Sequence, residues 1–177
     1  MVKKLAKFFA YTLFFILALI AFMPKESLYF LLEENLQKFG VVLSNEQLEE
    51  SFFSLNIENM EISAKGIDSA LVEEADITLL LVYNSVDVKN IKLSSLVESY
   101  LPSKIDTLHI RYTLINPFEV EAQSHGGFGD ATIHFNIVDR NVSVILKPSK
   151  KMFQKYRNSL REFKKSQNGE YVYAKTF

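Results

Sequence analysis

Three histidines are the residues whose type most readily suggests metal chemistry in this chain. His109 and His134 lie in segments that alternate polar and apolar residues, and His125 stands beside glycines. A zinc site needs three or four ligands at characteristic spacings, and the spacing of these histidines matches no such pattern. We therefore predict no metal site and interpret the three side chains as solvated residues on the polar faces of strands.

A carboxylate pair, Glu119 and Glu121, projects to one face of a predicted strand. General acid and base catalysis needs two carboxyl groups whose environments separate their pKa values, which an open sheet face does not supply by itself. The motif HGGFGD, from His125 to Asp130, precedes a strand and lacks the lysine of a phosphate-binding loop, so it is predicted to be a turn. We expect no catalytic residue, no cofactor and no enzymatic activity.

Positive charge is concentrated near the C-terminus. Acidic residues predominate among the charged residues between 24 and 146, whereas the charged residues between 147 and 165 are all basic apart from Glu162. Apolar residues recur there at helical spacing, which predicts a basic amphipathic helix over residues 149–166. Its cations are the predicted contacts with anionic lipid or with an acidic partner: Lys150, Lys151, Lys155, Arg157, Arg161, Lys164 and Lys165. The alternative is that the helix only caps the core and these cations are its solvated face.

A membrane segment is predicted at the start of the chain, ahead of all the candidate residues. Residues 5–23 form an apolar run preceded by Lys3 and Lys4, and with snorkelling of Lys7 the run approaches the length of a membrane-spanning helix. The basic bias predicts an N-terminus in the cytoplasm and a main domain on the outer side of the membrane. A cleaved signal peptide is the alternative, although the small residues of a cleavage site are absent. Residues 1–23 are thus predicted to be a cytoplasmic tip and anchor.

A linking helix is predicted over residues 24–40, because Pro24 is typical of a helix start and Gly40 of a helix end. Its apolar stripe is expected to pack on the domain that follows, and contact of the stripe with the membrane surface is the alternative. The stripe consists of Leu28, Leu31, Leu32, Leu36 and Phe39.

From Val41 the apolar period changes to two, which indicates half-buried strands over residues 41–148. Short connections such as Asn116-Pro117 predict an antiparallel meander. The predicted apolar face includes Leu108, Ile110, Tyr112, Ile133, Phe135 and Ile137. The motif apolar-x-apolar-x-Asn-apolar-x-apolar-Ser occurs at residues 55–63 and 86–94, where Asn59 and Asn90 break the alternation and predict a bulge or tight corner. A last strand is predicted over residues 170–177.

The predicted fold class is mainly β with flanking helices. An N-terminal transmembrane helix precedes one domain, residues 24–177, in which an antiparallel, curved β-meander is packed by an N-terminal and a C-terminal amphipathic helix. The chain contains no cysteine, which excludes disulfides and thiolate metal sites.

This layout resembles the type II secretion system protein N family and, more broadly, the AsmA-like bacterial envelope proteins. The resemblance rests on residues 24–40, 55–63, 75–94 and 126–146. It implies a single-pass protein of the bacterial inner membrane, with its main domain in the periplasm and no catalysis, that serves secretion machinery or envelope lipid traffic.

We therefore expect a non-enzymatic accessory or scaffold protein of secretion or envelope assembly. Its partners would be the lipid bilayer and other inner-membrane or periplasmic proteins, and export disfavours nucleic acid. The alternative is a periplasmic lipid-binding or lipid-transfer module that uses the apolar face of its sheet as a groove. Whether that face is covered in the folded domain separates the two functions.

Overall fold

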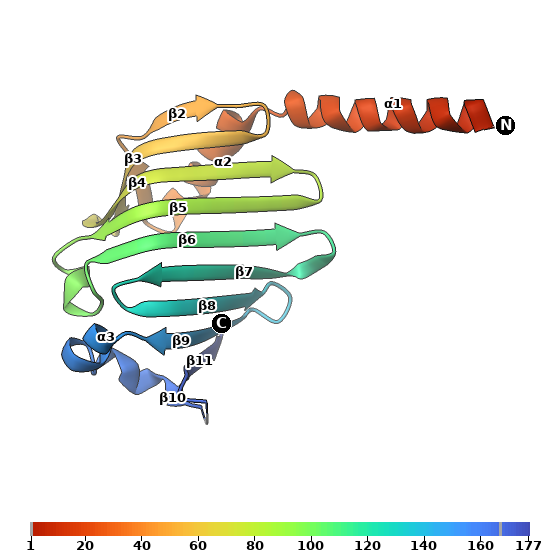
Figure 1. Cartoon of the computed structure of the whole chain (residues 1–177). Helices are drawn as coiled ribbons and strands as arrows, with labels where there is room; N and C mark the ends of the chain where they lie inside the picture. The colour runs from red at the N-terminus through yellow and green to blue at the C-terminus, as the bar shows by residue number, and fades with distance from the viewer. Residues whose placement is uncertain (1, 167) are drawn as a thin grey trace.

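The computed structural model describes residues 2–166 and 168–177. It contains one mainly antiparallel β-sheet, preceded by a long apolar helix that stands away from it (Figure 1). Met1, at the start of the predicted cytoplasmic tip, lies outside the described residues. The predicted fold class, a curved meander with flanking helices, is confirmed.

Helix α1 (Val2–Ala21) is long and apolar enough to cross a membrane, by its length and composition. Helix α2 (Lys25–Lys38) follows after a short break and confirms the predicted linking helix. The break falls where Pro24 would interrupt the backbone hydrogen bonds of a continuous helix.

Eleven strands form a single sheet whose order along the sheet is β1-β3-β4-β5-β6-β7-β8-β9-β11-β10, with β2 also paired to β3. Every pairing is antiparallel. The strands are β1 (Val41–Ser44), β2 (Gln47–Glu50), β3 (Ser54–Ala64), β4 (Ile67–Leu80), β5 (Tyr83–Leu93), β6 (Lys104–Thr113), β7 (Asn116–Gly126), β8 (Gly129–Asn136), β9 (Asn141–Pro148), β10 (Lys164–Lys165) and β11 (Tyr171–Thr176). The predicted meander and last strand are thus both present.

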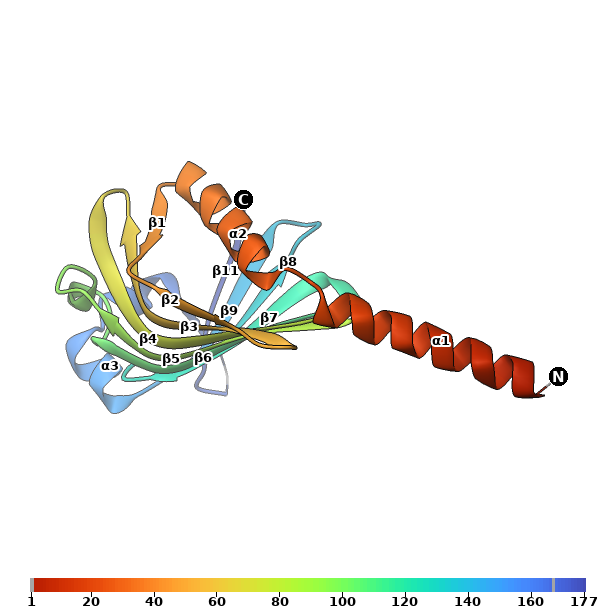
Figure 2. The same cartoon turned by 90° about the horizontal axis from the view of Figure 1, so that it is seen from above.

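The sheet curves strongly, as the view along its edge shows (Figure 2). Asn59 and Asn90 take the left-handed conformation, with φ of 58° and 54°, which asparagine tolerates better than most residues. The register of β3 on β4 continues unchanged past Asn59, from the pair Glu58–Glu74 to the pair Met60–Val72. The predicted interruption is therefore a corner and not a register-shifting bulge, and it keeps the apolar residues on one face as the strands bend.

Two buried clusters hold the domain together, and both lie on the same face of the sheet. The first lies between α2 and strands β1 and β3–β5, and it includes Tyr29, Leu55, Ile57 and Val72. The second lies at the far end of β9, under the C-terminal segment, and is formed by Phe128, Leu146, Met152, Tyr156 and Leu160. The core is therefore divided between the two flanking segments.

Of the expected stripe of α2, only Leu36 packs on the domain, against the first cluster. Leu28, Leu31, Leu32 and Phe39 are exposed, and the buried residues of the helix are Lys25 and Tyr29. Tyr29 is on the side of α2 that faces the sheet, and its hydroxyl lies 3.7 Å from the Met60 sulfur. The prediction was wrong for the other four residues, because the face that α2 turns to the sheet runs through Lys25, Tyr29 and Leu36.

The C-terminal segment is helical only in part. Helix α3 (Lys150–Lys155) is capped by Ser149, whose hydroxyl accepts a hydrogen bond from the Met152 amide at 3.1 Å. The 3₁₀ turn η2 (Ser159–Glu162) and β10 replace the rest of the predicted helix 149–166. At the start of η2, Ser159 donates a hydrogen bond to the Tyr100 carbonyl at 2.6 Å, and the chain then pairs with β11 through β10.

Candidate functional site

The apolar face of the central strands is the candidate site. Register pairs Ile110 of β6 with Ala122 of β7, and Ala122 with Ile133 of β8. The next row runs from Tyr112 through Val120 to Phe135 in the same way. Side chains of paired residues lie on one face of a sheet, so the predicted apolar residues of β6 and β8 are brought together in continuous rows.

These rows extend beyond the residues that sequence analysis assigned to the site. Ile133 pairs with Val144 of β9 and Phe135 pairs with Val142, while Ile110 pairs with Val86 of β5. The alternation of apolar and polar residues in β9 would have placed Val142 and Val144 in these rows. Ile137 is a correction, because β8 ends at Asn136 and Ile137 lies in the β8–β9 turn, 44% exposed.

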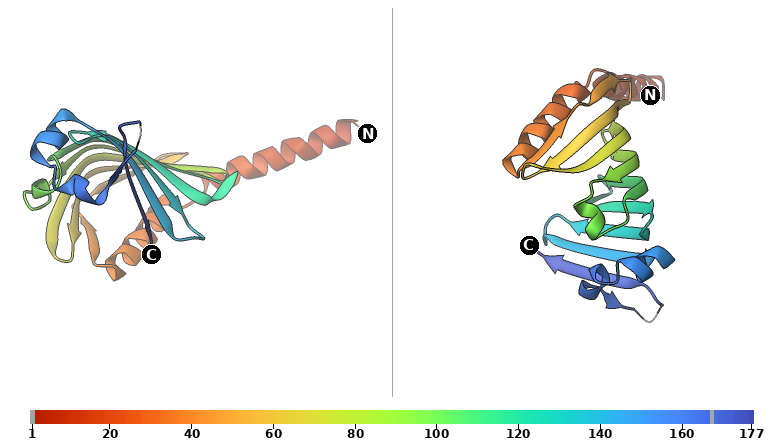
Figure 3. Two further views of the ribbon diagram at one scale, coloured as in Figure 1. Left: turned by 90° about the horizontal axis from the view of Figure 1, so that it is seen from below. Right: turned by 90° about the vertical axis from the view of Figure 1, so that its left-hand side faces the viewer.

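The middle of this face is only partly covered. Leu108 packs against the first buried cluster and Ala131 against the second. Within the described chain, however, Ile110, Tyr112, Ile133 and Phe135 belong to neither cluster and are only half-buried. Side chains in a closed core would be almost fully buried. The apolar face between α2 and the C-terminal segment is therefore left partly exposed, on a sheet whose curvature the ribbon views show (Figure 3).

The opposite face of the sheet is polar and its charges are paired between strands. Lys89 of β5 lies 2.9 Å from Glu74 of β4, and this carboxylate raises the pKa of the lysine. Gln123 and Arg111 hydrogen-bond Glu121 and hold its pKa below the usual range. This face is therefore polar, with cross-strand partners for several of its charged side chains.

The three histidines and the carboxylate pair lie on this polar side, each with a local partner. The Nδ1 atom of His134 lies 3.0 Å from Glu119, and that of His125 lies 2.6 Å from Asp130, while His109 contacts Asp87. Among residues 2–166 and 168–177, no group of three or more histidine or acidic residues is arranged to hold a metal ion.

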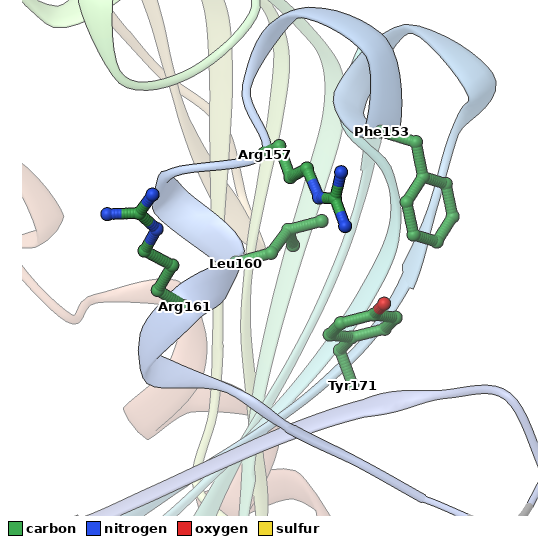
Figure 4. A pocket seen from close by; sticks show the side chains of 5 residues that line it. All are labelled: Phe153, Arg157, Leu160, Arg161 and Tyr171. Atoms are coloured by element: carbon green, nitrogen blue, oxygen red, sulfur yellow. The ribbon is translucent and has the colours of Figure 1, made fainter.

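The predicted cations do not form one continuous helical face. Arg157 and Arg161 line an open pocket of about 650 Å³ together with Phe153, Leu160 and Tyr171 (Figure 4). Lys150, Lys151 and Lys155 lie on α3, and Lys164 and Lys165 form β10. Helix α3 lies at the end of the sheet away from α1 (Figure 1). Contact of these cations with a partner stays a prediction, and this placement puts them far from the membrane that α1 would enter.

The fold and site together define a class of protein: an apolar N-terminal helix joined to a curved antiparallel sheet with an open apolar face. Neither family models, nor curated proteins, nor solved structures give a match to this chain.

Proposed function

We propose that this protein is a membrane-anchored lipid-binding or lipid-transfer module, which holds acyl chains against the open apolar face of its sheet. The observation that carries the proposal is the pair of apolar rows around Ile110 and Phe135, which are left partly exposed between two covered regions. An apolar surface of this kind in water is typical of a binding site. The polar pairs on the opposite face offer no comparable surface.

The proposed setting follows from α1. The helix would anchor the protein in the inner membrane of a bacterium, with its N-terminus in the cytoplasm and the sheet in the periplasm, because lysines precede the apolar run. Acyl chains would reach the sheet from the bilayer, which is a source of lipid beside the domain. No chemical step is proposed, and lipid traffic of this kind accords with the resemblance to AsmA-like envelope proteins.

Site-specific photo-crosslinking tests this function in the full-length chain in membranes. A photoreactive phenylalanine derivative placed at Ile110 or Ile133 should label phospholipid. The matched control is Thr132, next to Ile133 on the same strand and on the polar face, where labelling should be weak. Equal labelling at Ile133 and Thr132 would contradict the proposal.

A second candidate is an accessory or scaffold protein of secretion machinery or envelope assembly. The observation that favours it is the outer edge of β11, where β10 pairs only with Tyr171 and Val172. Within the described residues the rest of this edge has no strand beside it, and free strand edges accept further strands. A photo-crosslinker at Ala174 that captured no inner-membrane or periplasmic secretion protein would count against it.

A further inference from the structure

The connections at the end of the sheet nearest α1, together with Phe118 near the start of β7, carry large exposed apolar side chains. We name these residues the rim: Leu81, Val82, Leu114, Ile115, Phe118, Ile137 and Val138. Val82 is 63% exposed and Ile115 is 94% exposed. The β4–β5, β6–β7 and β8–β9 turns thus present apolar tips on three successive hairpins.

The chemistry of these turns is opposite to what hairpins require. The β4–β5 turn consists of Leu81 and Val82, and the β6–β7 turn of Leu114 and Ile115, whereas two-residue turns strongly favour Asn, Asp and Gly. The β3–β4 turn at the other end of the sheet follows the rule, with Lys65 and Gly66 at φ of 52° and 76°. Because folding does not explain apolar residues at the rim, another requirement must.

The position of the rim indicates what that requirement is. All three tips lie at the end of the sheet from which α1 leaves the domain (Figures 1 and 2). A cavity of about 430 Å³ is lined by Leu81 together with Phe15, Ala18 and Leu19 of α1 and with Phe22, which follows the helix. The β4–β5 tip is therefore at the same depth as the last turns of the apolar helix.

We infer that the rim enters the interface of the bilayer that α1 spans, so that the sheet stands on the membrane with its hairpin tips among the lipid headgroups and upper acyl chains. The occupant is lipid because the rim is continuous with an apolar helix of membrane-spanning length. Asp139 and Arg140 share the β8–β9 turn with Val138, which suits a depth at the headgroups better than the hydrocarbon centre.

This inference rests on α1 as a membrane span and is independent of lipid binding on the sheet face. If both hold, the rim would bring the open face to the surface of the lipid reservoir. If the face carries no acyl chain, the rim would still fix the orientation of the domain on the membrane.

The chain contains no tryptophan, so a single introduced tryptophan reports its own surroundings. Ile115→Trp and Phe118→Trp are made in the full-length chain, which is reconstituted into phosphatidylcholine vesicles with or without brominated acyl chains. Tyr100→Trp is the control, because Tyr100 is aromatic, 69% exposed and lies in the β5–β6 connection at the opposite end. We expect blue-shifted emission and bromine quenching for both rim variants, and water-like, unquenched emission for Tyr100→Trp.

Two results would overturn the inference. The first is water-like emission from both rim variants, equal to that of the control, in protein whose circular dichroism shows an intact sheet. The second is blue-shifted emission without bromine quenching, because protein and not lipid would then cover the rim. Val138→Trp gives the same test on the third hairpin should either first variant fail to fold.

Discussion

The ammonium group of Lys25, at the start of α2, lies 3.2 Å from the carboxylate of Glu50 at the end of β2. The lysine side chain is fully buried, and its ammonium also lies 3.4 Å from the Met23 carbonyl. The hydrogen bond from Lys25 holds the pKa of Glu50 below its usual range. This pair therefore joins the sheet to the junction between α1 and α2.

We expect Glu50→Gln to lower the melting temperature of the full-length protein in detergent, because it leaves a buried ammonium without its counter-charge. The neighbouring variant Glu49→Gln, at an exposed position of the same strand, is the matched control and should melt as the native protein does. Thermal unfolding followed by circular dichroism measures both. Adding Lys25→Met to Glu50→Gln should recover part of the loss, and a further decrease would show that the ion pair is not the cause.

The same pair predicts a dependence of stability on pH. Since the pKa of Glu50 is lowered in the folded state, its contribution is complete above the pKa of an ordinary carboxyl group. It is lost as the pH falls through the lowered value. The difference in melting temperature between native protein and Glu50→Gln should therefore shrink in acid.

The left-handed residue Asn59 is a second point where a single side chain matters. With φ at 58°, a β-branched residue there would cost about 1–2 kcal/mol. We expect Asn59→Val to lower the free energy of unfolding by that amount in denaturant titrations, and Asn59→Gly to cost less. Asn56→Val is the control on the same strand, where φ is not positive. Equal losses for Asn59→Val and Asn56→Val would contradict the proposed corner.

The corners at Asn59 and Asn90 could be predicted from the sequence because the alternation of apolar residues breaks there. The strands β6 to β9 could be predicted because their period-two patterns are intact. The end of the helix after Lys155 could not, since Met152, Tyr156 and Leu160 keep helical spacing while all three are buried in the second cluster. Tertiary contacts decided that conformation.

Whether the apolar face of the candidate site is covered could not be predicted from the sequence either. Alternation in β6 and β8 shows that Ile110 and Ile133 share a face, but it does not show which segment covers that face. The exposed leucines of α2 illustrate this limit, because an apolar stripe predicts a buried face only where a partner surface meets it. The rim was missed although Leu81-Val82 and Leu114-Ile115 stand at turn positions where polar residues are the rule.

Gly129 offers a test of the close backbone contact between β8 and the end of β9. Its φ is 115°, and a Cβ atom there would lie 2.1 Å from the Lys147 carbonyl oxygen. We expect Gly129→Ala to destabilise the protein by about 4 kcal/mol or more, measured by denaturant titration. Gly66→Ala is the control, because Gly66 has φ of 76° but open space around its Cβ position, so only backbone strain of about 1–2 kcal/mol is expected. Equal costs would refute the steric clash.

His125 and Asp130, which flank the β7–β8 turn, give the last prediction. The hydrogen bond and negative charge of Asp130 raise the pKa of the His125 imidazole above its ordinary value of 6.5. Asp130→Asn should return the pKa of His125 toward that value in an NMR titration, whereas Asp139→Asn, in the β8–β9 turn at the other end of β8, should leave it unchanged. Because the folded-state pKa is raised, the pair stabilises the fold fully below the ordinary pKa and loses this effect as the pH rises through the raised value. Asp130→Asn should therefore lower the melting temperature in mildly acidic solution and leave it unchanged in alkaline solution, and a loss that is the same at every pH would point to a purely structural role for Asp130.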